Sequence, residues 1–302
     1  MNLAALLEGE AWLTVDILLG LAIGGAVLRW GLADRLMARL TPWLRRHGIG
    51  PLVGLSLTVS LGSSRAGAAI LASALDEGRL DRRAALWGTL ALAFPAYLRR
   101  WPATFALCAS MAGGAGAVFA VVLLLRSAAR FALALALLRR GGGCETEPDE
   151  WTAEGRAARR GSLLRDLRAK LLRTLPLAWA LFAAAYALVP WLEGAFQRWF
   201  MGGTFLPLSG WAVAAASIAH VSAALSLAGG GLASGDLSPA QAVFALLLGN
   251  GLGILTRAVR QNAGYYFGLF PPDLARSMLF WNVGTMLPLV LLSLLLAAVP
   301  LG

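Results

Sequence analysis

The sequence has little charge and almost no cysteine. Only 14% of its 302 residues are charged, 58% are hydrophobic, and the two cysteines are Cys108 and Cys144. Two cysteines so far apart do not suggest a disulfide framework or a thiolate metal site. Little charge together with long apolar runs excludes an ordinary soluble enzyme and predicts an all-α integral membrane protein.

The sequence also lacks the motifs of familiar catalytic machinery. It contains no HExxH or GxSxG pattern and no paired carboxylates within an apolar segment. Those patterns carry metal-dependent hydrolysis and nucleophilic acyl transfer. We therefore expect no enzyme activity, no cofactor and no metal site.

The charge that is present is mostly basic, with a net charge of +10. The arginines gather beside apolar runs, where the cytoplasmic flanks of membrane helices are enriched in Lys and Arg. We therefore interpret the excess as an orientation signal and expect no nucleic-acid partner. Acidic residues near the N-terminus and a basic stretch at 29–46 predict a multi-pass protein of the cell membrane with both termini outside.

The apolar runs follow the same order in two halves of the chain. The first half, residues 1–140, has a retained span at 12–30, an interfacial helix at 32–46, an interrupted run at 49–75, a broken run from 84, and an apolar crossing over 104–125 that continues through Arg126 and Arg130. Residues 141–173 predict a cytoplasmic linker. The second half, residues 174–302, has a span at 175–192, an interrupted run at 207–232, a broken run at 240–256 and a last span at 277–299.

An offset of 157 residues aligns the halves, and it places Gly78, Leu80 and Arg100 on Gly235, Leu237 and Arg257. If the run at 49–75 enters and leaves the membrane on the cytoplasmic side, each half crosses three times. The repeats are then inverted, as in many transporter folds. We predict two inverted repeats with re-entrant hairpins and broken helices.

The first interrupted run carries an arginine in its middle, in Gly62-Ser63-Ser64-Arg65-Ala66-Gly67. A charge at the bilayer centre costs about 2.5–3.5 kcal/mol on insertion scales and is normally compensated by a partner, water or substrate. Backbone amides at a helix start can also bind an anion. Ser63, Ser64 and Arg65 are therefore candidate substrate-binding residues. The alternatives are a structural pair with Asp16, or a shallow tip from which Arg65 reaches the interface.

The second half supplies three further candidates. Its interrupted run contains His220 and Ser222, and Asn250 lies within Gly249-Asn250-Gly251-Leu252-Gly253, where we expect a helix break. A lone histidine on an apolar helix is more often a hydrogen-bonded packing residue than a proton relay. Glycines in membrane helices also serve close packing. Arg100 and Arg257, at the ends of the broken runs, have interface anchoring as their alternative role.

Several short segments resemble a nucleoside-recognition or "gate" domain: Leu40-Thr41-Pro42-Trp43-Leu44, Gly48-Ile49-Gly50, the small-residue stretch from Ser60 to Gly67 and the turn at Gly78. This domain is similar across spore maturation membrane proteins, B-type ferrous iron transporters and concentrative nucleoside transporters. The resemblance covers 30–106 and, less closely, 190–262. It implies a transport-related protein whose hairpin tips line a polar site.

The chain departs from the known branches of that family. It has no GTP-binding P-loop and no cysteine or acidic cluster near the tips to suit a divalent cation. For ribose and base recognition it offers only Asn250, Gln261, Asn262 and Asn282. Iron transport is therefore not expected.

Intramembrane ionisable groups that are mostly arginine favour an anionic solute. The sequence predicts a transporter or facilitator for a small polar solute, anionic or nucleoside-like, that works by alternating access around two hairpin tips. Its partners would be membrane lipid, that solute and a further copy of the chain. The alternative is a non-transporting scaffold or accessory subunit with the same fold.

Overall fold

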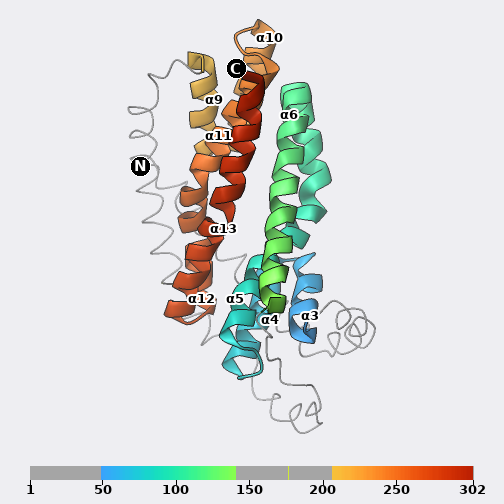
Figure 1. The fold of residues 1–302 in the computed structure, drawn as a ribbon, viewed down its shortest axis with the longest axis vertical. Helices are drawn as coiled ribbons and strands as arrows, with labels where there is room; N and C mark the ends of the chain where they lie inside the picture. Colours follow the sequence, from blue (N-terminus) through green and yellow to red (C-terminus); the bar gives the residue numbers. More distant parts are fainter. Residues whose placement is uncertain (1–48, 141–175, 177–205, 302) are drawn as a thin grey trace. The chain divides into compact units, whose positions relative to one another are not determined.

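In the computed structural model, residues 49–140, 176 and 206–301 are described, and they are almost wholly helical (Figure 1). No strand occurs among these residues. The predicted elements at 12–30, 32–46 and 141–173 lie outside the described part, as does nearly all of the span at 175–192. The described helices are compatible with the all-α membrane protein that the sequence predicts.

Among the described residues, three helical stretches are long and apolar enough to cross a membrane. They are residues 82–140, Pro239–Arg257 and Pro272–Ala298. A helix needs about 20 apolar residues to span the hydrocarbon core of a bilayer. Length and composition therefore support a membrane protein.

The predicted interruption of the run at 49–75 is confirmed. Helix α3 (Pro51–Ser60) ends before residues 61–63, and α4 (Ser64–Asp76) then begins. Ser63 caps α4, because its hydroxyl accepts a hydrogen bond from the amide of Ala66 at 3.3 Å. The two helices pack against each other, and Gly67 allows the approach: a Cβ there would stand 2.6 Å from the carbonyl oxygen of Ser56.

The run at 207–232 is interrupted at His220, which joins α9 (Leu208–Ala219) to α10 (Val221–Ser234). His220 has φ −145° and ψ 119°, close to the −151° and 117° of Ser63. In both places one extended residue lies at the end of a break between two packed helices. The predicted likeness of the two interruptions thus holds for the local backbone.

A glycine-centred turn follows each helix pair. Gly78 has φ 68° and Gly235 has φ 80°, in the left-handed region that glycine enters at little cost. The next helix then begins at a side-chain cap, Asp81 for α5 (Arg82–Ala91) and Ser238 for α11 (Pro239–Arg257). Acceptor oxygens at these positions satisfy amides that have no partner within the helix.

Helix α6 (Ala93–Arg140) is two helices joined by a reversal at Ala112 and Gly113, where the backbone is not helical. The indole nitrogen of Trp101 donates a hydrogen bond to the carbonyl of Ala120 at 3.2 Å. In a straight helix these residues would be about 28 Å apart. The two arms therefore lie side by side (Figure 1). The long apolar stretch predicted over 104–125 is thus not one continuous helix.

Helix α11 runs unbroken through residues 249–253, so the helix break predicted there is wrong. The glycines serve close packing instead. A Cβ on Gly249 would collide with the backbone of Ala214 in α9, and one on Gly251 would stand 2.6 Å from Cγ1 of Val290 in α13 (Pro272–Ala298). The irregular backbone comes directly after α11, as a π-helix over Ala258–Ala263, which α12 (Gly264–Leu269) follows.

The chain forms two compact units whose segments alternate along the sequence. The first unit takes its described residues from 1–97, 131–181 and 263–279, and the second from 98–130, 182–262 and 280–302. Each unit draws on both halves of the chain. The predicted division into 1–140, 141–173 and 174–302 stays a prediction.

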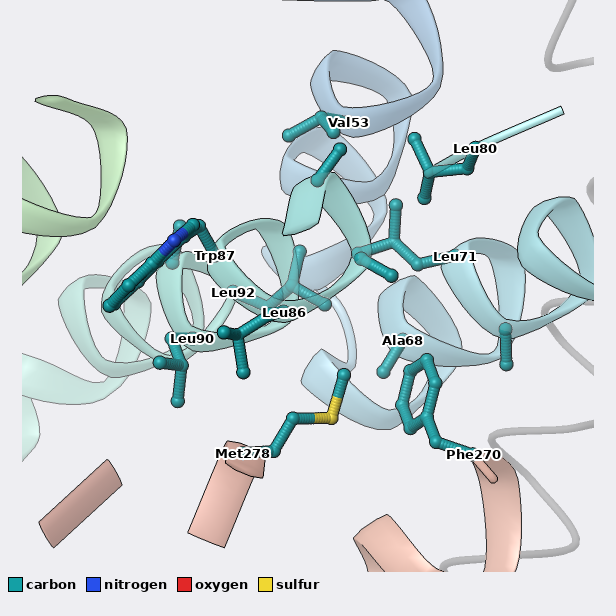
Figure 2. Packing of buried hydrophobic residues seen from close by; sticks show 14 of the residues in the cluster. Val53, Ala68, Leu71, Leu80, Leu86, Trp87, Leu90, Leu92, Phe270 and Met278 are labelled. Atoms are coloured by element: carbon teal, nitrogen blue, oxygen red, sulfur yellow. The ribbon is translucent and has the colours of Figure 1, made fainter. Parts of the chain in front are cut away.

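Each unit has its own apolar core. In the first unit, side chains from α3, α4, α5 and the start of α13 gather around Leu71, with Trp87 and Met278 among them (Figure 2). In the second unit, fully buried Phe119 and Leu225 belong to a cluster from α6, α9, α10 and α11. Alanines fill much of both cores, since small residues let membrane helices approach closely.

Candidate functional site

A cavity of about 170 Å³ lies within the second unit. The second arm of α6, helix α11 with its π-helical continuation, and α13 all contribute to it. None of the described residues that line it is acidic. The polar residues of the lining are Arg126, Arg130, Asn250, Arg257, Asn262 and Asn282.

Two of the arginines lie one helical turn apart on α6. Residues four apart share a helix face, so Arg126 and Arg130 both reach the cavity. They are only 5% and 8% exposed. Charged side chains are rarely so buried, and an ionisable residue within an apolar membrane segment marks a functional site by default. This arm of α6 is therefore the charged wall of the cavity.

Asn250 connects arginines from two different helices. Its Oδ1 accepts a hydrogen bond from Nη2 of Arg126 at 2.9 Å, and its main-chain oxygen accepts one from Nη2 of Arg257. A guanidinium has five N–H donors in a planar fork, so each bond uses part of its donor capacity. Both acceptors on Asn250 are neutral. Asn250 therefore orients two positive charges and cancels neither.

Arg257 folds back along its own helix over Gly253. A Cβ on Gly253 would stand 2.7 Å from Nη1 and 3.4 Å from Cζ of Arg257. The absence of a side chain at 253 thus leaves the space that the guanidinium occupies. Together with the bond to the carbonyl of Asn250, this fixes the direction in which Arg257 points.

The lining suits a negatively charged ligand. Three guanidinium groups supply positive charge and forked N–H donors, and the amides of Asn250, Asn262 and Asn282 add neutral donors. The π-helix contributes Ala258 and Asn262, and π-helical turns are frequent at functional sites.

The first three predicted site residues lie together at the start of α4, in the first unit. Ser63, Ser64 and Arg65 are each partly exposed. The carbonyl of Ser64 accepts a hydrogen bond from the hydroxyl of Tyr265 at 3.1 Å, and Cζ of Arg65 lies 5.9 Å from the centroid of the Tyr265 ring. That distance is within cation–π range. Asp16 lies outside the described residues, so its pairing with Arg65 stays a prediction.

The other three predicted residues belong to the second unit, where the structure separates their roles. Asn250 lines the cavity, whereas His220 and Ser222 are exposed and are not among its lining residues. Because Ser63, Ser64 and Arg65 belong to the first unit, the grouping of all six residues into one site stays a prediction.

Sequence reasoning missed the arginines of this cavity. It took Arg126 and Arg130 as the continuation of an apolar run and gave Arg257 interface anchoring as an alternative role. Two spacings carried the signal. Arg126 and Arg130 are four residues apart, and Arg257 follows Asn250 by seven, which puts each pair on one helix face.

Comparison with known proteins identifies no relative of this chain: no protein-family model, curated protein or solved structure matches it. The assignment of function therefore depends on the residues and the geometry of the cavity. The likeness to a gate domain stays a prediction.

Proposed function

We propose that this protein is a membrane transporter or facilitator for a small anion, and that the anion binds in the cavity of the second unit. One observation carries the proposal: Arg126, Arg130 and Arg257 line a single cavity in a chain whose described part includes three helical stretches apolar enough to cross a membrane. Arginine in such surroundings is expensive, and it is kept where it serves a substrate pathway.

The charge of the lining favours an anion over a neutral solute. A cleft that carries one sign of charge between low-dielectric walls raises the local concentration of the opposite ion. Here the described lining has three arginines and no carboxylate. The field of these residues therefore attracts anions.

The size of the cavity favours a small anion over a nucleoside-like solute. Pockets for drug-sized ligands measure about 300–1,000 Å³. The present cavity holds about 170 Å³. An inorganic oxyanion or a short carboxylate fits that space better than a ribose with a base.

Internal duplication supports a transport mechanism. With 157 subtracted, α9 and α10 fall on 51–62 and 64–77, against 51–60 and 64–76 for α3 and α4, and the start of α11 falls on that of α5. The turn glycines and the buried leucines that follow them match too: Gly78 with Gly235 and Leu80 with Leu237. Repeated units that line a site are common in secondary transporters. We propose that the repeats are inverted, that their paired helices are re-entrant and gate-like, and that their movement gives alternating access.

Solute flux into proteoliposomes tests the proposal. The purified full-length chain would be reconstituted, and uptake of phosphate, sulfate, acetate, chloride and uridine would be measured under an imposed gradient. We expect uptake of at least one oxyanion, and a loss of at least tenfold in Arg126→Gln. Arg139→Gln is the matched control, since it removes the same charge from an exposed position on the same helix.

Two results would contradict the proposal. Flux that is equal in the wild type and in Arg126→Gln would remove the cavity from the pathway. No flux of any solute under any gradient would instead favour a membrane scaffold or accessory subunit with this fold.

A further inference from the structure

We propose that the cavity selects a phosphate-like oxyanion, with at least two acceptor oxygens, over a monatomic anion. Arg126 and Arg257 would bind separate oxygens of the anion, and Asn250 would position both guanidinium groups. The inference rests on the proposed function in one respect, namely that the bound anion is the transported solute. Selective binding itself can be tested without transport.

The donors of the cavity converge from two helices. One arginine comes from α6 and the other from α11, and both donate to a single residue, but to two different atoms of it. The side-chain Oδ1 and the main-chain oxygen of Asn250 thus hold the two groups as separate donors beside one cavity. Two donors that converge from different helices match a ligand with more than one acceptor atom.

The guanidinium group is suited to an anion with several oxygens. Its planar fork matches the oxygens of a carboxylate or phosphate two at a time, whereas a spherical ion gains no such match. Asn250 engages one nitrogen, Nη2, of each of the two guanidinium groups, and each group has five N–H donors in all. A third fork, that of Arg130, lies one turn from Arg126.

Neutral amide donors also line the cavity. Asn282 is only 7% exposed and lines the same cavity as Asn262. Amide N–H groups can donate to the lone pairs of an oxyanion. A tetrahedral anion with several oxygens uses these amides and the arginines together.

The neutrality of Asn250 provides the sharpest test. Asn250→Asp keeps the shape and the acceptor for Arg126, but it places a negative charge beside both arginines. The aspartate would then compete with the anion for the same guanidinium groups. If the cavity had only a structural role, this variant would bind phosphate no differently from the wild type.

Binding would be measured with the full-length protein in an uncharged detergent, by equilibrium dialysis with radiolabelled phosphate and by thermal unfolding. Chloride at equal ionic strength is the comparison ion. We expect phosphate to bind saturably. Displacing the bound phosphate should take at least a tenfold higher concentration of chloride than of sulfate. Equal displacement by chloride and sulfate would overturn the selectivity.

Three variants locate the binding. Asn250→Asp should weaken phosphate binding at least tenfold and keep its fold, as followed by circular dichroism and gel filtration. Arg126→Lys retains the charge but loses the fork, so it should also bind phosphate at least tenfold more weakly. Arg139→Gln should bind as the wild type does. Unchanged binding in Arg126→Lys would show that charge alone acts and would overturn the inference.

A phosphate group can come from free solute or from a lipid headgroup. The second arm of the experiment adds phosphatidylglycerol or phosphatidylcholine in nanodiscs. One outcome is that phosphatidylglycerol stabilises the wild type but not Arg126→Lys, while free phosphate does not bind. That outcome supports the recognition of a phosphate group by the cavity, but it contradicts transport of a free anion. Phosphate binding without flux in proteoliposomes would likewise contradict only the proposed function. If neither free phosphate nor phosphatidylglycerol has a selective effect, the proposed binding site is wrong.

Discussion

Gly229 of α10 lies directly against the main-chain carbonyl of Met111 in α6, in the second unit. A Cβ on Gly229 would stand closer than 3.0 Å to that oxygen, a separation that real Cβ atoms do not show. Gly229→Ala should therefore force the two backbones apart and lower the free energy of unfolding by about 1–3 kcal/mol. Titration with a denaturing detergent measures the change.

The neighbouring glycine is the matched control. Gly230 has nothing within 4 Å of an added Cβ. Since alanine is a better helix former than glycine, Gly230→Ala should leave stability unchanged or raise it by up to about 1 kcal/mol. Equal destabilisation by both substitutions would show that the contact with Met111 is not what requires glycine at 229.

Gly113 makes the reversal within α6 through its backbone conformation. Its φ of 55° and ψ of −137° belong to a region that side chains other than glycine rarely enter, although an added Cβ would meet nothing within 4 Å. Gly113→Ala should thus lower the free energy of unfolding by about 1–3 kcal/mol through backbone strain alone. Gly114→Ala also meets open space and has no positive φ, so its unfolding curve should overlay that of the wild type.

Tyr265 ties α12 to the start of α4 in the first unit. Tyr265→Phe removes the hydrogen bond to the carbonyl of Ser64 and keeps the ring near Arg65. We expect a loss of about 0.5–1.5 kcal/mol in the free energy of unfolding. Tyr265→Leu also removes the cation–π contact and should lose more. Thermal unfolding of both variants checks the order, and a larger loss in Tyr265→Phe would contradict it.

Gly253 should affect anion binding more than stability. An added Cβ would meet the far end of the flexible Arg257 side chain, so the guanidinium would move and the fold would stay. We expect Gly253→Ala to bind phosphate about tenfold more weakly, or about 1.4 kcal/mol. Gly284→Ala in α13 meets nothing within 4 Å and serves as the control. Equal phosphate affinities in the two variants would contradict the positioning of Arg257.

The ion pair between Arg82 and Asp273 should contribute little to stability. Both side chains are more than half exposed, at 60% and 64%. Exposed pairs are typically worth about 0.2–1 kcal/mol and are screened by salt. Arg82→Gln should therefore shift the unfolding free energy by less than about 1 kcal/mol, and the shift should shrink as salt is added.

Local features of the described fold were predictable where a residue type fixes the backbone. The break before Ser64 follows from Gly62 and the capping hydroxyl of Ser63, and α13 follows from a long apolar run. The reversal at Gly113 was missed because it lies in a stretch of small residues that also suits close helix packing. Gly249 and Gly251 were predicted to break a helix, but they allow close packing instead. Only the neighbouring helices show whether a glycine serves close approach or a turn.

The cavity could not be predicted from local sequence patterns. Asn250 was predicted for the wrong reason, as part of a helix break that does not exist. Asn250 is bonded to Arg126, which is 124 residues away and is brought to it by the tertiary fold of the second unit. Periodicity places a side chain on a face, but it does not say which distant helix will cover that face.

That separation also sets an order of events during synthesis. Arg126 leaves the ribosome 124 residues before Asn250, which corresponds to roughly 6–25 s at about 5–20 residues per second. For that interval the newly made helix exists without Asn250, which later accepts a hydrogen bond from its Arg126. Asn282, Met286 and Val290 of α13 complete the lining of the cavity, so the cavity cannot assemble before that helix has been made.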